Sequence, residues 1–269
     1  MDRREFVSAA AIAAGGLMAS PAESLAGGAT AQTPSPEYYE LRHYQLRRGQ
    51  TQVIEDYWRQ AAIPAIQRAG AGPVGVFNVM IGPRSPMLTV LIVHKTIDSF
   101  ATLPSRLAAD AEHQRAGAAY LDAVATSPAF VRVEVSLLRA FDGMPALALP
   151  FGGGDAGKRR RIFELRTYES HSEKAGRTKI EMFNRAEIAI FRRAGMTPVF
   201  FGQRLAGSEM PSLTYMLVYE DMAAHDKQWA AFGADPEWRT LSTTPGYTDP
   251  DIVANITNMY LRPAEYSQI

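Results

Sequence analysis

The feature that most constrains this chain is a short phrase of sequence that occurs twice. The segment Tyr39–Tyr44 reads YELRHY, and 124 residues later the segment Phe163–Tyr168 reads FELRTY. Further matches hold an offset of 125 residues: 68–70 with 193–195, 73–74 with 198–199, 88–89 with 213–214, and 109–112 with 234–237. One register held through so many elements indicates a tandem duplication, so both halves should share one fold.

Within each half, hydrophobic periodicity and turn residues predict the order β-α-β-β-α-β. In the first half we expect strands at 38–44, 74–81, 87–95 and 130–141, with helical regions at 50–69 and 97–125. In the second half we expect strands at 162–168, 197–205, 213–219 and 252–261, with helices at 174–194 and 222–241. Pro64 and Pro104 lie inside predicted helices and should kink or interrupt them. This order is ferredoxin-like, with both helices on one face of an antiparallel sheet.

The chain divides where composition breaks this pattern. The predicted segments are a signal peptide at 1–31, a lead-in at 32–37, a first repeat at 38–142, a linker rich in Gly, Pro and basic residues at 143–161, and a second repeat at 162–269.

The N-terminus has the pattern of an export signal. Arg3 and Arg4 precede Phe6 and an apolar stretch, rich in Ala and Gly, that ends near Ala19. The paired arginines resemble a twin-arginine signal, and Ala-Thr-Ala at 29–31 offers a cleavage site. The alternative, a membrane anchor, is disfavoured because the stretch is short and poor in large apolar residues. We therefore expect a periplasmic or secreted protein, with no stable membrane span after cleavage.

Composition excludes several classes of partner and site. Lys plus Arg and Asp plus Glu number 28 each, so net charge gives no reason to expect a nucleic-acid partner. The absence of cysteine excludes disulfides, thiolate metal sites and a cysteine nucleophile. The chain has no dinucleotide or Walker loop, no H-E-x-x-H and no G-x-S-x-G. We expect no cofactor and no metal site.

Three motifs together resemble the NIPSNAP family over roughly residues 38–266. They are the Glu-Leu-Arg-x-Tyr strand, the Arg-Ala-Gly helix end, and Asp-Pro-Glu-Trp at 235–238, where the first half has Asp-Ala-Glu-His at 110–113. The resemblance implies the dimeric α/β-barrel fold, in which two ferredoxin-like units pack sheet to sheet, here within one chain. It leaves activity open, because related barrels include cofactor-independent monooxygenases and haem enzymes, and eukaryotic members have interaction roles.

Two polar sets stand out because residues two apart in a strand share a face. Glu40, Arg42 and Tyr44 form one set, and Glu164, Arg166 and Tyr168 form the other. Leu41 and Leu165 suit a helix-covered face, so we expect both sets to point into the interior between the two sheets. In a functional reading, arginine holds an anionic group while glutamate or tyrosine moves a proton. In the alternative, which the duplication favours, the sets are buried ion pairs that fix how the sheets dock.

Histidines distinguish the two halves. His43, His94 and His113 align with Thr167, Tyr219 and Trp238. We place His43 on the helix-facing side of its strand and His113 on the covering helix, where together they could line a pocket as a base or bind a metal or haem. The alternative is two unrelated histidines, one in the core and one on the surface. His171 and His225, near element ends, should be exposed.

These observations predict a small-molecule binding protein or a cofactor-independent enzyme. The candidate roles are His43 as base, His113 as its pocket partner, Arg42 as anion clamp and Tyr44 as proton donor. A non-catalytic scaffold is the alternative, and a haem-binding barrel a third hypothesis. Exposed edge strands would also allow a homo-oligomer.

Overall fold

The computed structural model describes residues 35–49, 51–150 and 161–269 of the chain. The predicted signal peptide and part of the predicted linker therefore lie outside the described residues. Within the described ranges, no helix is both long enough and apolar enough to cross a membrane.

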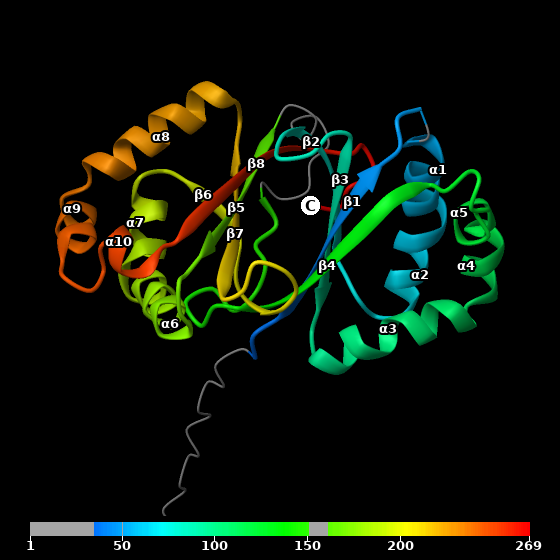
Figure 1. The fold of residues 1–269 in the computed structure, drawn as a ribbon, viewed down its shortest axis with the longest axis horizontal. Coiled ribbons are helices and arrows are strands. Elements are labelled where there is room, and N and C mark those ends of the chain that lie inside the picture. The colour runs from blue at the N-terminus through cyan, green and yellow to red at the C-terminus, as the bar shows by residue number, and fades with distance from the viewer. Residues whose placement is uncertain (1–34, 50, 151–160) are drawn as a thin grey trace, which may run out of the picture. The chain divides into compact units, whose positions relative to one another are not determined.

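Each half contains four strands and a set of helices (Figure 1). The first half consists of β1 (Tyr38–Leu46), α1 (Thr51–Asp56), the π-helical turn η1 (Tyr57–Ala62), α2 (Ile63–Arg68), β2 (Val74–Ile81), β3 (Met87–His94), α3 (Ile97–Ala109), α4 (Ala111–Ala116), α5 (Ala118–Leu121) and β4 (Phe130–Ala140). The second half consists of β5 (Ile162–Glu169), α6 (Glu173–Met182), the π-helical turn η4 (Phe183–Glu187), α7 (Ile188–Arg193), β6 (Thr197–Ala206), β7 (Ser212–Tyr219), α8 (Met222–Ala234), α9 (Pro236–Thr243), α10 (Asp249–Ile252) and β8 (Asn255–Pro263).

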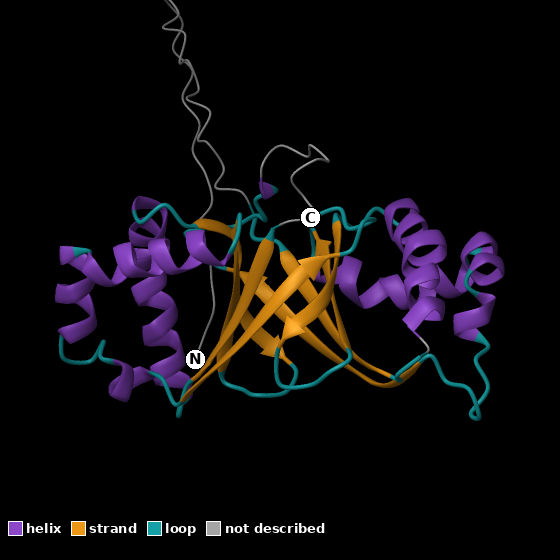
Figure 2. Ribbon diagram, turned by 90° about the horizontal axis from the view of Figure 1, so that it is seen from above, coloured by secondary structure: helices purple, strands orange, loops and turns teal. Residues whose placement is uncertain are grey.

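The strands close into one antiparallel barrel in the order β1-β3-β2-β8-β5-β7-β6-β4. Each half supplies four neighbouring strands in the ferredoxin-like order, and the halves join where β2 pairs with β8 and β4 pairs with β6. Figure 2 shows the strands between two groups of helices. This arrangement confirms the predicted fold, an intramolecular barrel of two repeated units.

The barrel interior is filled by apolar side chains from both halves. The rings of Tyr39 and Phe200 lie 4.8 Å apart, and those of Phe77 and Phe163 lie 5.0 Å apart. Interiors of eight-stranded barrels are just wide enough for side chains to fill. Burial of these side chains therefore joins the two halves into one core.

The predicted facing of the first strand in each half is wrong. Leu41 and Leu165 lie in the barrel interior, whereas Tyr44 and Tyr168 belong to the apolar clusters beneath the helices. The Glu-Arg-Tyr sets accordingly lie between sheet and helices, outside the barrel. Alternation separates the two faces of a strand, but it does not say which face is which when both are buried.

The helices match expectation at Pro64 but not at Pro104. A π-helical turn occupies the same place in both halves, and in the first half Pro64 lies in the first turn of the new helix that follows it, as predicted. Helix α3 continues through Pro104, which is exposed, so water can hydrate the carbonyl group that loses its partner. The chain breaks instead at Asp110.

The repeated Ala-Asp-x-Glu motif has a structural role. Asp110 and Asp235 each accept the backbone N–H three residues on, which caps α4 and α9. Each aspartate also accepts a 2.9 Å hydrogen bond from an arginine at the end of an earlier helix, Arg68 or Arg193. The Arg-Ala-Gly motif therefore ties one helix end to the start of another.

Candidate functional site

Two equivalent ion pairs lie between the sheet and its helices, one in each half. Arg42 donates from Nε to Glu40 at 2.6 Å, and Arg166 donates to Glu164 at 2.9 Å. Each arginine also lies 3.3 Å from the hydroxyl of the tyrosine two residues on. The shared geometry means that the pair itself is part of the repeated scaffold.

In the first half a buried histidine contacts the carboxylate of this ion pair. Glu40 lies 3.0 Å from His94 Nε2, and Nδ1 of that ring lies 3.0 Å from Ser99 Oγ. His94 is completely buried. Burial alone would raise the pKa of Glu40, but the hydrogen bond from His94 and the charge of Arg42 hold it below its usual value. This half has the arrangement of a buried structural ion pair.

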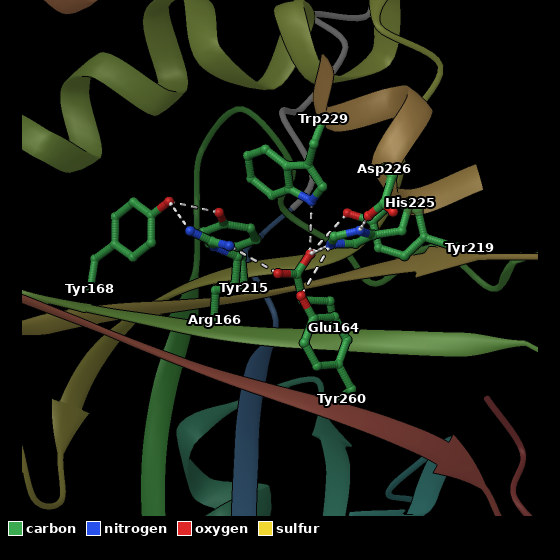
Figure 3. Close-up of polar contacts among 9 residues, drawn as sticks. All are labelled: Glu164, Arg166, Tyr168, Tyr215, Tyr219, His225, Asp226, Trp229 and Tyr260. Atoms are coloured by element: carbon green, nitrogen blue, oxygen red, sulfur yellow. Dashed lines mark hydrogen bonds and ion pairs between the residues drawn. The ribbon is translucent and has the colours of Figure 1, made fainter. Parts of the chain in front are cut away.

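The second half surrounds the matching carboxylate with different donors (Figure 3). Oε2 of Glu164 accepts from the Tyr219 hydroxyl at 3.0 Å and from Trp229 Nε1 at 3.1 Å. Glu164 is fully buried, whereas Trp229 of α8 is only partly covered. One side of the carboxylate therefore lies beneath side chains that reach the protein surface.

His225 completes this second-half cluster, and its nitrogens face two carboxylates. Nε2 lies 3.2 Å from the Tyr260 hydroxyl and 3.6 Å from Glu164 Oε2, while Nδ1 lies 2.8 Å from Asp226 Oδ1. Its side chain is 12% exposed, so the expectation of an exposed histidine at a helix end is wrong. The repeat offset places Phe100 at this position in the first half. The imidazole is therefore an addition to the repeated scaffold.

The surroundings of His225 combine aromatic faces with one cation. The guanidinium of Arg166 lies 4.6 Å from the centre of the Trp229 ring, and its Nε is buried with no hydrogen-bond partner among the described residues. Burial and the charge of Glu164 raise the pKa of Tyr260, which keeps its hydroxyl protonated at neutral pH. The cluster thus holds a proton donor, a proton acceptor and a fixed positive charge.

A cavity of about 450 Å³ lies beside this cluster. Its lining includes Tyr219, the donor to Glu164, together with Thr197 of β6 and Gln228 of α8. Oε1 of Gln228 is buried without a hydrogen-bond partner among the described residues. The volume falls within the range of small-molecule sites.

His43 and His113, the histidines expected to share a pocket, are on opposite faces of the sheet. His43 faces the barrel interior, where its Nδ1 lies 3.1 Å from Thr89 Oγ1. His113 is buried on the helix side, with Nε2 3.1 Å from the Tyr57 hydroxyl and Nδ1 3.0 Å from the Leu107 carbonyl. The structure therefore does not bring the two imidazoles together, nor His43 beside Arg42.

The helices of the second half also contain a buried ion pair that has no counterpart at the matching positions of the first half. Lys179 Nζ lies 3.1 Å from Glu187 Oε2, and both side chains are at most 2% exposed. Burial raises the pKa of Glu187, an effect that Lys179 opposes. The repeat offset places Ile54 and Ala62 at these two positions in the first half.

Sequence reasoning placed Glu164, Arg166 and Tyr168 together but missed His225, Tyr219, Trp229 and Tyr260. The alignment of the two halves does point to His225, because it sets this imidazole against Phe100. The residues around His225 come from α8, β7 and β8, and the alignment does not show that these elements meet in the fold. No group of three or more potential metal ligands occurs within the part of the chain that the structure describes.

Comparison with known proteins places the chain in a fold group and a family. Two putative monooxygenases share the fold: one from Fusobacterium nucleatum (TM-score 0.54, 8% identity, 85% of this chain and 93% of that one) and one from Lactobacillus acidophilus (TM-score 0.53, 10% identity, 85% and 94%). An anthrone oxidase-like protein is also similar (TM-score 0.51, 10% identity, 86% and 93%). At these identities the likeness shows the fold alone, and no curated protein matches the chain in sequence. The NIPSNAP family model matches residues 39–132 and 163–268, one match in each half of the barrel, so the chain belongs to the NIPSNAP family.

Proposed function

We propose that this protein binds a weakly acidic, aromatic small molecule beside His225 and exchanges a proton with it, without a resident cofactor. The observation that carries the proposal is the position of His225. It lies between the exposed Asp226 and the buried Glu164, at a place where the first half has phenylalanine. A structural ion pair needs no such imidazole, because the first half forms its pair without an accessible one.

In this proposal each nitrogen of the imidazole has a role. Nδ1 donates its hydrogen to Asp226, which leaves the lone pair of Nε2 as the acceptor. When a bound phenol or enolisable carbonyl gives up its proton, the O–H or C–H bond breaks, the proton goes to Nε2 and the electron pair stays on the ligand. Both carboxylates then stabilise the imidazolium, and Arg166 offers positive charge to the anion.

The direct test uses 4-nitrophenol, whose phenolate absorbs at longer wavelength than the neutral phenol. At a pH below the phenol's own pKa, the protein should bind the probe and strengthen the phenolate band. The H225F variant installs the residue of the first half and should lose that band while keeping its melting temperature. H171F, at the other histidine of the second half, is the matched control. An equal phenolate band with H225F would show that proton transfer lies elsewhere.

A non-catalytic scaffold remains the second candidate function, and two observations favour it. The barrel interior is filled, and β4 carries an exposed row of valines. A scaffold would bind no small molecule beside Glu164, so native mass spectrometry of the purified protein with 4-nitrophenol separates the candidates.

We also propose that the protein is exported through the twin-arginine route. The support is the sequence pattern around Arg3 and Arg4. Replacing both arginines by lysine should retain the protein in the cytoplasm, whereas replacing Arg47 and Arg48 by lysine should not. Equal export of the two variants in cell fractionation would contradict the proposal.

A further inference from the structure

The N-terminal half of β4 has one edge without a partner strand among the described residues. On one side β4 pairs with β1 along almost its whole length, but on the other it pairs with β6 only over Leu137–Ala140. The backbone N–H of Ala140 points to β1 and that of Phe141 points to β6. Backbone direction alternates along a strand, so Val133 and Val135 direct their N–H and C=O groups toward the open edge, whereas the register shift opposite Gln45 and Leu46 makes Val131 the extra residue of a bulge.

These three valines also expose their side chains. Val131, Val133 and Val135 are 54%, 37% and 42% exposed. Val133 and Val135 share the outer face of the sheet with Tyr44 and Arg42, their partners on β1, yet the helices that cover Tyr44 leave these valines open. An exposed apolar strand with free backbone groups is a template for pairing with another strand.

We infer that this edge pairs with the same edge of a second copy of the chain. The segment Val131–Val135 reads VRVEV and is self-complementary in an antiparallel arrangement. A two-fold axis at Val133 sets Val131 against the partner's Val135 and Arg132 against the partner's Glu134, once on each side. Opposite charges on facing residues of paired strands stabilise the pair, and each valine meets a valine.

The surfaces beside the strand extend this contact. In each copy the turn after β6 lies against Ser136, because a Cβ atom on Gly207 would stand 2.6 Å from the Ser136 hydroxyl. The two-fold axis sets the partner's Ser136 opposite Phe130. It therefore brings the partner's turn after β6, which carries the half-exposed Met210, toward the start of β4 in the first copy. A cavity of about 350 Å³ lies there. Its lining includes Val53, Val124 and Ala129.

The second half lacks this pattern at the matching place. By strand pairing, Val133 and Val135 correspond to Ile256 and Asn258 of β8, since they face Tyr44 and Arg42 as these face Tyr168 and Arg166. The matching segment, residues 254–258 at the start of β8, reads ANITN and has no facing charges. The valine edge is therefore not a by-product of the duplication, and a second copy of β4 is the strand that it fits.

The test is the solution mass of the full chain by light scattering during gel filtration. The wild-type protein should have the mass of two chains at micromolar concentration. R132E sets two carboxylates together twice per dimer and should weaken the dimer by about tenfold or more. The charge swap R132E/E134R restores the facing charges and should bind more tightly than R132E, although it also removes the ion pair of Glu134 with Arg84 of the same chain. V133K places two ammonium groups on the two-fold axis and should give monomers, whereas I256K on β8 should leave the dimer intact.

Hydrogen exchange provides an independent measurement. In the dimer the amides of Val133 and Val135 should be protected, and V133K should release Val135 to fast exchange without altering the amides of β5. A wild-type monomer, or a dimer that V133K and R132E do not weaken, overturns the inference. Equal loss of the dimer with I256K overturns it as well.

Discussion

At the scale of single residues, His43 makes the stability of this protein sensitive to acid. Burial, reinforced by the nearby charge of Arg204, lowers the pKa of His43 from 6.5 to about 4. The unfolded chain therefore takes up a proton at a higher pH than the folded chain does. This contribution to stability is complete at pH 7.5 and is lost as the pH falls from about 6.5 toward 4.

We predict that the contribution of His43 to the free energy of unfolding falls by about 2 kcal/mol between pH 7.5 and pH 5. H43T installs the residue found in the second half, where Thr167 and Thr214 lie 3.0 Å apart in the equivalent position. Urea unfolding at both pH values should show the variant losing less stability than wild type by about that amount. An identical pH dependence in the two proteins would contradict it.

Also at this scale, the sequence was sufficient to single out the Glu-Leu-Arg-x-Tyr residues but not to orient them. Tyr39 and Tyr44 are both buried, one in the barrel and one beneath the helices, so apolar content does not separate the faces. His225 escaped prediction because its significance depends on Glu164 and Tyr260. These residues lie on two strands distant from it in sequence.

At the scale of elements, Lys179 and Glu187 test what a buried ion pair contributes to the helix layer. Replacing Lys179 by isoleucine should destabilise the protein by about 3–5 kcal/mol, because the carboxyl group of Glu187 keeps its burial and loses its partner. The double variant K179I/E187A copies Ile54 and Ala62 of the first half. It should recover much of that loss, to be measured as the free energy of unfolding in urea.

Recovery is expected because apolar replacement of a buried pair is often neutral or stabilising. A double variant no more stable than K179I would instead indicate that each charge has further partners. Lys179 does lie 5.4 Å from the centre of the Tyr168 ring, so a small residual loss is consistent with the structure.

The order of the helices and strands was predictable because sequence matches at one constant offset span both halves, so each uncertain segment could be compared with its counterpart. The residues at which the elements begin and end were less predictable. Helix α3 runs through Pro104 and stops at Asp110. The side chain of Asp110 caps the start of α4 and accepts a hydrogen bond from Arg68. Proline content alone gave the wrong boundary, whereas the repeated aspartate marks the right one.

At the scale of the whole molecule, the shared barrel interior makes the halves dependent on each other. Contacts such as Phe77 with Phe163 are between halves, so either half alone would expose the interior face of its sheet. Expressed separately, residues 35–142 and 161–269 should aggregate or self-associate. Expressed together, they should purify as a one-to-one complex with a cooperative melt. A folded monomer of either half would contradict this.

His225 is the residue at which we propose that ligand chemistry takes place. The chain has five histidines, so nitrogen-detected NMR of the imidazole rings can follow each one, with assignments from single substitutions. We expect Nδ1 of His225 to carry the hydrogen in the free protein. We also expect 4-nitrophenol to shift the His225 ring toward imidazolium and to leave His43, His94, His113 and His171 unchanged. If a saturating probe left the His225 ring unchanged, or protonated another histidine instead, the proposed role of His225 would be wrong.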